Sequence, residues 1–387
     1  MKLHEFQGKD LFKKYGIPVP AGQVALSAEE ALSFARIIGR PCVLKAQIFQ
    51  GGRGKAGGVA VAQSPQQAFK IGEELLKSRL KGEPVSKILI EEKVDFASEA
   101  YLAIAIDDVR GKPVAMASAS GGVDIEEQPE KIASRYINPL LGLRGYEAVA
   151  LGKRAGFSGK MLLEVAAVLQ KMYRLFSDYD AELVEINPAF VDLNQKVIAG
   201  DSKIIINDDS LFRHGEFKLD EHQSAIMDPF ELKAKELGFT FVNLGGNIAV
   251  ISVGAGFTMT LLDMIHHFGG KPANFADMMG GSGAETMAKM ADLVLTKINQ
   301  DQEIKALLIT ITFTATSLDG IIRGLVASLQ NHPPRVPVVS AIRASDAAVL
   351  EMDLPTAQEF LKKAGAAVFD EIADAIKAAV EYASERK

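Results

Sequence analysis

A glycine-rich segment with two basic residues is the first part of the sequence that could do chemistry. Between Gly51 and Gly58 the chain carries five glycines together with Arg53 and Lys55, directly after the β-rich run PCVLKAQIF. The pattern is not a Walker A loop, because Lys55 is followed by alanine, and it is not a dinucleotide fingerprint, because the strand-like VAVAQS follows it in place of a helix. We therefore expect a pliable turn between antiparallel strands, whose N–H groups and basic side chains suit phosphate. A hairpin tip that carries solvated charges is the other interpretation.

A second candidate site lies in AELVEINPAFVDLNQKVIAGDSKI, which is typical of a hairpin with its turn near Asp192–Gln195. Glu185 and Asn187 are alternate residues of its first strand, so both side chains should lie on one face of a sheet. Asp201 follows on the predicted return strand. An amide oxygen and a carboxylate on neighbouring strands suit Mg²⁺, which takes one or two protein oxygens and completes its shell with water and phosphate. The two features together predict a site for a magnesium nucleotide, and a hairpin with acids near its turn is the alternative.

The composition narrows the class of protein. The formal net charge of −6 gives no electrostatic case for nucleic acid or an anionic membrane as a partner. A single cysteine, Cys42, excludes an intramolecular disulfide and a cysteine zinc cage. The apolar runs are shorter than the ~18 residues of a membrane span. The N-terminal MKLHEFQGKDLFKKYG lacks the apolar region of a signal peptide. We therefore expect a cytoplasmic protein.

The order of the predicted elements changes near residue 235, and a chain of 387 residues is expected to hold two or three domains. Before that point helices and strand candidates are mixed, and Ser27 is the predicted N-cap of a helix over 28–38. From about Asn243 strands alternate with helices of 10–15 residues, which predicts a parallel sheet covered on both faces. The predicted class is α/β: an α+β domain over 1–235, with a lid subdomain at about 20–105, then a parallel-sheet domain over 236–387.

Several motifs, in this order along the chain, resemble the beta subunit of the succinyl-CoA synthetase family. They are KAQIFQGGRGKAGGV, ILIEEKVDFASEAYLA, SGGVDIEE, LVEINPAF, GDSKI, SLFRHGEF, NIAVISVGAG and GGKPANFADMMGG. The resemblance covers essentially the whole chain. It implies an ATP-grasp domain followed by a flavodoxin-like CoA-ligase domain. It also implies an enzyme that makes an acyl-CoA from a carboxylic acid, CoA and ATP or GTP, through an acyl phosphate and a phosphorylated histidine.

The resemblance implies roles for individual residues. Lys45 would contact the nucleotide phosphates, and Glu185 would contact the phosphorylated histidine, whose protonated or polarised form a carboxylate favours. The remaining positions are Gly52, Arg53 and Gly54 in the covering flap, Glu91, Val94 and Glu99 on the base and ribose side, and Asn187 and Asp201 as Mg²⁺ ligands.

None of the six histidines lies in a context that resembles the phosphorylated histidine of this family. In the family that histidine and the main CoA-binding domain belong to an alpha subunit. The resemblance therefore implies that this chain is half of an enzyme, in an αβ or α₂β₂ assembly. Its C-terminal domain would direct a helix N-terminus at the phosphohistidine.

The C-terminal domain departs from the family pattern where the family contacts the acid or the phosphate. Val253 stands where the family has asparagine, and TITFTATSLDG replaces a Gly-Gly-Ile segment. The threonines from Thr310 to Thr316 alternate, so a continuing strand would show their hydroxyls on one face, although threonine is also simply a good strand former. The segment FTATSLDGIIRGL is also similar to part of ATP-citrate lyase. The candidate acid or phosphate contacts are Val253, Thr314, Thr316 and Ser317, and Arg343 is either a further one or a surface residue.

The resemblance implies succinate as the acid, which would place the enzyme in the tricarboxylic acid cycle. The altered segments favour a different small anionic acid, such as malate, citrate or the sulfonated acid sulfoacetate. Two other classes stay open: an ATP-grasp ligase that does not use CoA, and a non-catalytic subunit that keeps the fold.

Overall fold

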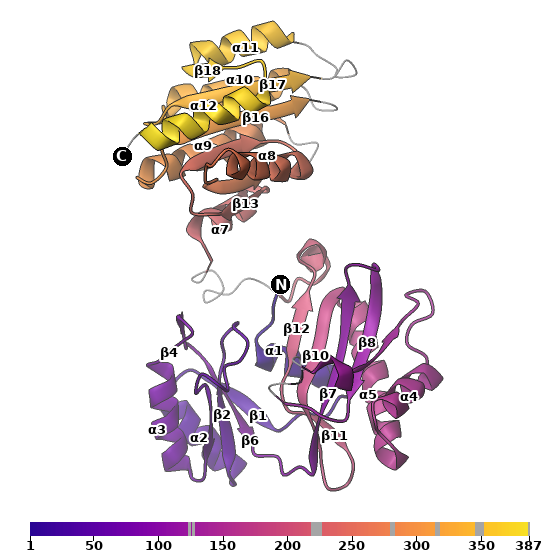
Figure 1. Ribbon diagram of the computed structural model, residues 1–387. Coiled ribbons are helices and arrows are strands. Elements are labelled where there is room, and N and C mark those ends of the chain that lie inside the picture. Colours follow the sequence, from indigo (N-terminus) through magenta and orange to yellow (C-terminus); the bar gives the residue numbers. More distant parts are fainter. Residues whose placement is uncertain are drawn as a thin grey trace. The chain divides into compact units, whose positions relative to one another are not determined.

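The chain forms two compact units in the computed structural model, residues 1–219 and 220–387 (Figure 1). The structure describes residues 1–122, 125, 128–217, 227–278, 283–313, 318–344 and 352–385. Across those ranges, each helix is too short or too polar to cross a membrane. The predicted domain boundary after residue 235 falls inside helix α7 (Pro229–Leu237), which belongs to the second unit. That boundary stays a prediction.

The smaller antiparallel sheet of the first unit carries the glycine segment. Its strand order is β1-β6-β2-β3. Helices α2 and α3 cover one face, where Leu44 and Ile90 lie fully buried in a hydrophobic cluster. The predicted N-cap is confirmed, because Ser27 accepts a hydrogen bond from the N–H of Glu30. The elements are β1 (Gly22–Ala25), α2 (Ala28–Ile38), β2 (Cys42–Ala46), β3 (Val59–Ala62), α3 (Pro65–Leu76) and β6 (Ile88–Glu92), with a separate pair formed by β4 (Arg79–Leu80) and β5 (Glu83–Pro84).

The larger antiparallel sheet of the first unit has β10 and β7 at its centre. Its strand order is β11-β10-β7-β8-β9, and β12 also pairs with β10. Residues of helices α1, α4 and α5 pack with its strands in one hydrophobic cluster, in which Leu169 and Met172 of α5 are fully buried. The elements are α1 (Glu5–Lys14), β7 (Ser98–Asp107), β8 (Lys112–Ser118), β9 (Ala133–Tyr136), α4 (Gly145–Arg154), α5 (Gly159–Asp178), β10 (Ala181–Val191), β11 (Val197–Ala199) and β12 (Lys203–Ile206), with short 3₁₀ turns at Pro129–Lys131 and Asp208–Arg213.

The predicted hairpin is confirmed, but its return segment is interrupted. Strands β10 and β11 are antiparallel, and the N–H of Asp192 donates to the carbonyl of Lys196 across the turn. The return segment then leaves the ladder between Ala199 and Lys203. Asp201 therefore lies between two short strands, and its predicted place on a strand is wrong.

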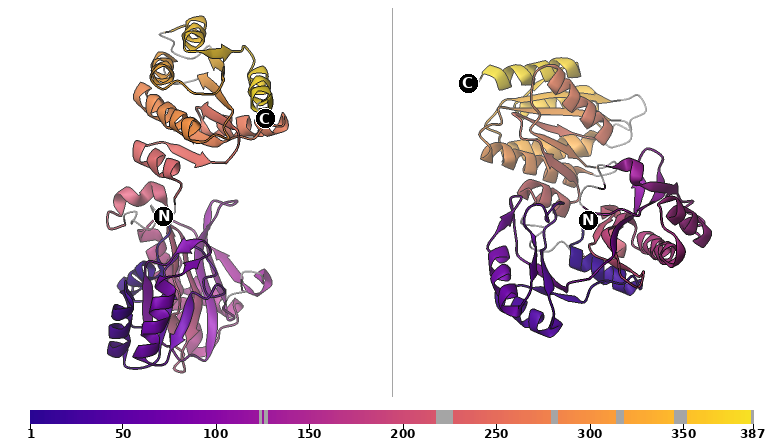
Figure 2. Two further views of the ribbon diagram at one scale, coloured as in Figure 1. Left: turned by 90° about the vertical axis from the view of Figure 1, so that its left-hand side faces the viewer. Right: turned by 60° about the horizontal axis from the view of Figure 1, so that its bottom comes forward.

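The second unit is built on a parallel sheet in the order β14-β16-β17-β18. Just before β15, Pro272 forms a parallel bridge with Ile248 of β14, which places β15 beside β14. With β15 included, the five strands follow the order 2-1-3-4-5 of flavodoxin-like folds, so the predicted class is confirmed. Helices α8 and α12 share one hydrophobic cluster and α9 and α10 another, on opposite faces of the sheet (Figure 2). The elements are β13 (Thr240–Asn243), β14 (Ile248–Ser252), α8 (Ala255–His267), β15 (Asn274–Asp277), α9 (Ala284–Gln300), β16 (Ala306–Phe313), α10 (Leu318–Asn331), β17 (Val338–Ala344), α11 (Leu354–Lys363), β18 (Ala366–Val368) and α12 (Ile372–Glu385).

One buried amide joins β15 to β14. The side chain of Asn274 is fully buried, and its Oδ1 accepts from the N–H of Val250 at 3.1 Å while its Nδ2 donates to the carbonyl of Val250 at 2.9 Å. Strand β15 itself pairs with β13 in an antiparallel sheet of two strands. The side-chain amide of Asn274 thus satisfies the backbone N–H and carbonyl of Val250, which a neighbouring strand would otherwise do.

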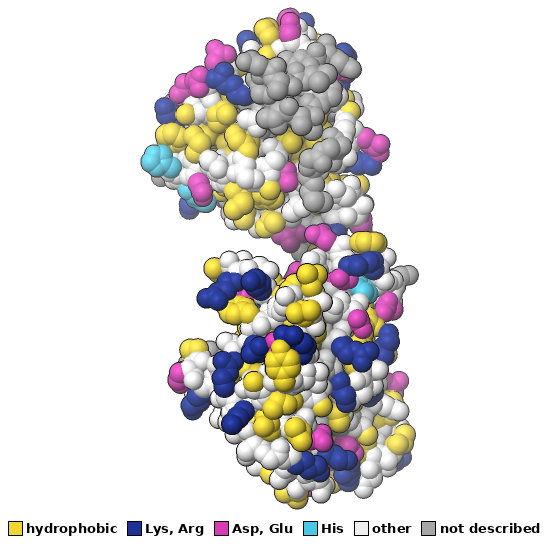
Figure 3. Space-filling model, turned by 90° about the vertical axis from the view of Figure 1, so that its right-hand side faces the viewer, with side chains coloured by type: hydrophobic (Ala, Val, Ile, Leu, Met, Phe, Trp, Pro, Cys, Tyr) yellow, Lys and Arg dark blue, Asp and Glu magenta, His cyan; other side chains and the backbone are white. Residues whose placement is uncertain are grey.

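The charged side chains on the surface carry both signs. On the face seen in Figure 3, Lys and Arg side chains are interspersed with Asp and Glu on each unit. Exposed pairs within helices, such as Lys77 with Glu73, contribute only a few tenths of a kcal/mol. Buried ion pairs therefore influence stability more than these exposed pairs do.

Candidate functional site

The glycine segment connects β2 to β3, which are antiparallel neighbours with Lys45 opposite Val59. The expected turn between antiparallel strands is thereby confirmed. Inside the turn the N–H of Gly58 donates to the carbonyl of Arg53 at 2.8 Å. Gly52 has a φ of 74°, which glycine adopts without strain. The flap is therefore a compact turn that returns on itself at Arg53.

A pocket of about 650 Å³ is lined by both sheets of the first unit. This volume is within the range of small-molecule sites. On β2, Val43 and Lys45 face the pocket, because the residues that alternate with them pack under α2 and α3. On β10, Glu185 and Asn187 face it for the same reason, so their predicted common face is confirmed. Residues 51–55 of the flap also line the pocket. The structure thus brings together the two sites that the sequence predicted separately.

Helix α1 contributes two charged residues to the pocket region that the sequence analysis did not single out. Glu5 and Lys9 lie one turn apart, and their side chains are only 2% and 3% exposed. The Nζ of Lys9 lies 2.9 Å from Glu5 Oε1 and 2.6 Å from Glu91 Oε1. The Nζ of Lys45 lies 2.9 Å from the same Glu5 oxygen and 2.8 Å from Glu91 Oε2. Both ammonium groups also donate to the carbonyl of Gly200. Each of these buried charges therefore has partners of the opposite sign.

Arg53 extends this arrangement from the flap to the larger sheet. Its Nη2 lies 3.0 and 2.9 Å from the two carboxylate oxygens of Asp201, and the same nitrogen donates to Glu5 Oε2. Its Nη1 donates to the carbonyl of Ala46 at 3.1 Å. The side chain of Arg53 is 11% exposed, whereas that of Asp201 keeps 35%. We call Glu5, Lys9, Lys45, Arg53, Glu91 and Asp201 the ion cluster; its three cations and three carboxylates balance in charge.

The ion cluster determines the charge of its members. Burial by itself raises the pKa of Glu5, but the neighbouring cations, Arg53 foremost, hold that pKa well below 4.5. Burial lowers the pKa of Lys45, but the carboxylates around it, Glu5 foremost, outweigh burial and raise the pKa. Burial also lowers the pKa of Lys9, which its carboxylate partners restore only in part. Glu5 is therefore an anion and Lys45 a cation at neutral pH.

The two predicted Mg²⁺ ligands both line the pocket. Asn187 Oδ1 accepts from the N–H of Gly122 at 2.9 Å, and Asn187 Nδ2 donates to the carbonyl of Gly122 at 3.2 Å, which holds the amide in one orientation. Asp201 Oδ1 also accepts from the N–H of Ser202 at 2.7 Å. Amide and carboxylate oxygens keep further acceptor capacity beyond these bonds. The donor set fits Mg²⁺, which needs few protein ligands, and the described residues hold no cluster of three or more His, Cys, Asp or Glu suited to a metal.

Of the three residues predicted for the base and ribose side, Glu91 and Val94 line the pocket and Glu99 does not. Val94 lines the pocket just after β6, and Phe96 stacks on Phe190 of β10 with centroids 4.5 Å apart and ring planes 13° apart. Glu91 also lines the pocket, but its carboxylate is occupied by the two lysines of the ion cluster. Glu99 lies on β7 opposite Phe190 and is not among the residues that line the pocket. The roles of Glu91, Val94 and Glu99 toward a nucleotide stay predictions.

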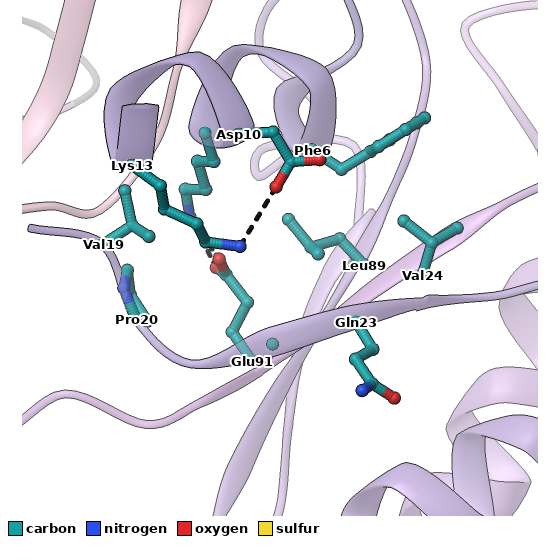
Figure 4. A pocket seen from close by; sticks show the side chains of 11 residues that line it. Phe6, Asp10, Lys13, Val19, Pro20, Gln23, Val24, Leu89 and Glu91 are labelled. Atoms are coloured by element: carbon teal, nitrogen blue, oxygen red, sulfur yellow. Dashed lines mark hydrogen bonds and ion pairs between the residues drawn. The ribbon is translucent and has the colours of Figure 1, made fainter. Parts of the chain in front are cut away.

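A second, smaller pocket of about 230 Å³ shares Lys9 and Glu91 with the ion cluster (Figure 4). Figure 4 shows the Glu91 side chain extending from its strand toward α1, where Lys13 and Asp10 form an ion pair of 3.1 Å. This volume is below the usual range of ligand sites. The larger pocket is therefore the candidate site.

In the second unit only part of the predicted acid pocket can be located. Val253 directly follows β14, is 8% exposed and belongs to a hydrophobic cluster. Thr310 and Thr312 lie on β16, and Arg343 of β17 donates to the carboxylate of Glu371. The acid-pocket assignments stay predictions. Three of the named residues lie outside the described residues: Thr314, Thr316 and Ser317.

Comparisons with known proteins agree on both units. Residues 2–191 match the family described as ATP-grasp domain, and residues 251–381 match the family described as CoA-ligase. The succinate–CoA ligase [ADP-forming] subunit beta of Natronomonas pharaonis is 37% identical, with 100% of each chain covered. The succinate–CoA ligase [GDP-forming] subunit beta of Thermus thermophilus is 40% identical over 88% of this chain and 90% of its own.

Among solved structures, ATP citrate lyase from Methanothrix soehngenii, in complex with citrate and coenzyme A, is similar with a TM-score of 0.78. The match covers 98% of this chain and 99% of that chain at 18% sequence identity. At this identity the likeness shows that the two proteins share a fold.

The ion cluster predicts an unequal response to two identical substitutions on helix α1. Lys9→Met should lower the free energy of unfolding by about 3 kcal/mol, because it leaves buried carboxylates with too few partners. Lys13→Met, one turn away, should change it by less than about 1 kcal/mol, because the Lys13 side chain is 51% exposed. Urea denaturation followed by circular dichroism measures the free energy of unfolding of both variants. If both substitutions lower it by the same small amount, the ion cluster does not stabilise the fold as described.

Proposed function

Because the chain belongs to the family of succinate–CoA ligase beta subunits, we propose that it is the nucleotide-binding half of an acid–thiol ligase. The reaction joins a carboxylic acid to CoA and converts a nucleoside triphosphate into the diphosphate and phosphate. One observation carries the proposal: Lys45 and Arg53 on one wall of a ligand-sized pocket face the oxygen ligands Asn187 and Asp201 on the other.

The flap wall supplies the contacts that phosphate needs. Lys45 stays protonated in its buried position because the carboxylates around it raise its pKa. Arg53 presents a guanidinium, whose planar donors match phosphate oxygens. Gly52 and Gly54 of the flap also line the pocket, and their backbone N–H groups would suit an anion. These residues would bind and orient the triphosphate and exclude water from it.

The opposite wall would hold Mg²⁺ through Asn187 and Asp201. A bound Mg²⁺ supplies charge neutralisation at the phosphate oxygens, which lowers the barrier to transfer of the terminal phosphoryl group. Asn187 would present its amide oxygen in the orientation that Gly122 fixes. Asp201 would contribute the negative charge.

The acceptor of the phosphoryl group would be a histidine of an alpha subunit. Glu185 supports this assignment, because its side chain is 10% exposed, faces the pocket and lies 3.7 Å from Lys203. A carboxylate there would accept a hydrogen bond from an arriving imidazole and orient it. The alpha subunit would bring CoA, and the acid would take the phosphoryl group before the CoA thiolate displaces phosphate from the acyl phosphate.

The family supports succinate as the acid, since the relatives are named succinate–CoA ligases. These relatives include both ADP-forming and GDP-forming enzymes, so ATP and GTP are both candidate nucleotides. A different small anionic acid, such as malate, citrate or a sulfonated acid, is the second candidate, favoured by Val253 and the altered threonine segment. The likeness to ATP citrate lyase concerns the fold and favours neither acid.

Removing the charge of Asp201 should abolish the contribution of magnesium. Asp201→Asn should weaken Mg-ATP or Mg-GTP binding by at least about tenfold in calorimetry, because one charge-assisted contact is lost, and should stop turnover with the alpha subunit. With Mg²⁺ chelated, the variant and the unaltered chain should bind the nucleotide equally weakly. Asp108→Asn, an exposed site with the same charge change, is the control. An Asp201→Asn chain with the full magnesium effect would refute the metal assignment.

Glu185 should influence transfer rather than nucleotide binding. With radiolabelled ATP, Glu185→Gln should slow labelling of the alpha-subunit histidine by about tenfold or more, since a positioned proton or hydrogen-bond partner contributes about 10²–10⁴-fold. The affinity for Mg-ATP should stay within about twofold in calorimetry, because the substitution leaves Lys45 and Arg53 in place. Glu182→Gln, an exposed residue of the same strand, is the matched control. Equal labelling rates in both variants would remove Glu185 from the transfer step.

An acid panel separates the two substrate assignments. The purified chain with its alpha subunit should release nucleoside diphosphate with succinate and CoA, and diphosphate release should depend on CoA. Turnover of succinate far above malate, citrate and sulfoacetate would support succinate; preference for another acid would support the altered pocket. Turnover that does not require CoA would point to the CoA-independent ligase class, and no turnover with any acid would point to a non-catalytic subunit.

A further inference from the structure

Arg53 makes two competing ionic contacts through one nitrogen. Its Nη2 donates to Glu5 Oε2 and lies within 3.0 Å of both oxygens of Asp201. Glu5 belongs to helix α1, and Asp201 belongs to the break between β11 and β12. The flap is therefore held by one carboxylate of helix α1 and one carboxylate of the segment between β11 and β12.

A magnesium ion at Asp201 would compete with Arg53 for the carboxylate oxygens. Both of its oxygens face the guanidinium, whereas a magnesium ligand must approach the metal to about 2.0–2.1 Å. Two cations held at one carboxylate also repel each other strongly in a partly buried site. The carboxylate has room for a further partner, but metal binding at Asp201 should weaken the contact of Arg53 there because the two cations repel.

When a metal ion binds Asp201, Glu5 can still hold Arg53 through its own contact with the guanidinium. Its side chain is 2% exposed, so water competes little with its partners. It lies in the first turn of α1, where the helix dipole favours an anion. Gln47, also fully buried, donates to Glu5 Oε2 at 3.5 Å and accepts from the N–H of Phe6 at 3.2 Å, which ties the start of α1 to β2. The Glu5 carboxylate is thus a fixed point of the structure.

We propose that Glu5 is a positioning residue that keeps Arg53 at the phosphate side of the pocket when Asp201 binds Mg²⁺. This role rests on the proposed function. Glu5 itself contacts neither nucleotide nor metal; it acts through Arg53. Without Glu5, Arg53 keeps Asp201 as its one carboxylate partner among the contacts described above and competes with the metal for it.

The decisive measurement is the magnesium requirement of nucleotide binding in the full-length chain. Calorimetric titrations of ATP, or of GTP if the unaltered chain prefers it, are run at a series of Mg²⁺ concentrations. Glu5→Gln should raise the Mg²⁺ concentration for half-maximal binding by about tenfold, the equivalent of one charge-assisted contact. In a chain that also carries Arg53→Met, Glu5→Gln should no longer raise it, because the competing cation is gone.

Two further variants keep the test decisive if Glu5→Gln does not fold. Glu5→Asp preserves the charge for Lys9 and Lys45 but is one methylene shorter, so it should raise the magnesium requirement in the same direction. Glu83→Gln is the matched control: Glu83 is a buried carboxylate that accepts from the N–H of Phe49 at 2.8 Å, just before the flap. It should leave the magnesium requirement unchanged.

The outcomes separate this inference from the proposed function. If Glu5→Gln and Glu5→Asp bind the nucleotide with the magnesium requirement of the unaltered chain, the positioning role is wrong and the proposed function stands. The same holds if the effect of Glu5→Gln persists in the Arg53→Met chain. If the unaltered chain and its alpha-subunit complex bind neither Mg-ATP nor Mg-GTP, the proposed function itself is wrong.

Discussion

The first unit depends on the requirement that buried charges be paired. Moving an unpaired carboxylate or ammonium group out of water costs several kcal/mol, so Glu5, Lys9 and Glu91 are stable in the interior only as a group. Their pairing requires helix α1 and both sheets to meet at one place. The phosphate-facing cations Lys45 and Arg53 belong to the same group, so the arrangement that satisfies the interior charges also orients the residues that would bind the ligand.

The second unit is held together differently. Its sheet is covered on both faces by apolar clusters, and a neutral polar contact helps to organise it: the Asn274 amide that replaces a strand pairing beside β14. Asp277, at the end of β15, accepts from the N–H of Gly254 at 2.8 Å and so fixes the start of α8. The two units therefore use different means for different tasks: the first concentrates charge around a pocket, and the second orients helix ends on an apolar scaffold.

Local patterns were enough to predict most of the fold and half of the site. Alternation of strand and helix predicted the parallel sheet of the second unit, and alternation of residues along β10 put Glu185 and Asn187 on one face. The short strands β1, β9 and β13 were missed, because runs of four residues carry little periodicity.

The residues of the site that the sequence did not reveal or misplaced, Glu5, Lys9 and Asp201, depend on contacts between distant parts of the chain. Glu5 and Lys9 are spaced one helical turn apart, a pattern that exposed helix faces also show, and only burial distinguishes the two cases. Asp201 was placed on a strand because the sequence does not reveal that the carbonyl of Gly200 accepts from two lysines instead of a neighbouring strand.

The stack of Phe96 on Phe190 has a mechanical consequence. Together with the bond from the N–H of Ala97 to the carbonyl of Val191, it fastens the segment after β6 to β10. In the register of β2 and β6, that segment follows the end where Cys42 pairs with Glu92, whereas the flap begins at the other end, beyond Ala46. The two sheets are thus joined at both ends of β2: by the phenylalanine pair near Cys42, and by the contact of Arg53 with Asp201 beyond Ala46. An opening of the flap therefore has to break the ion pair and can leave the stack of Phe96 on Phe190 in place.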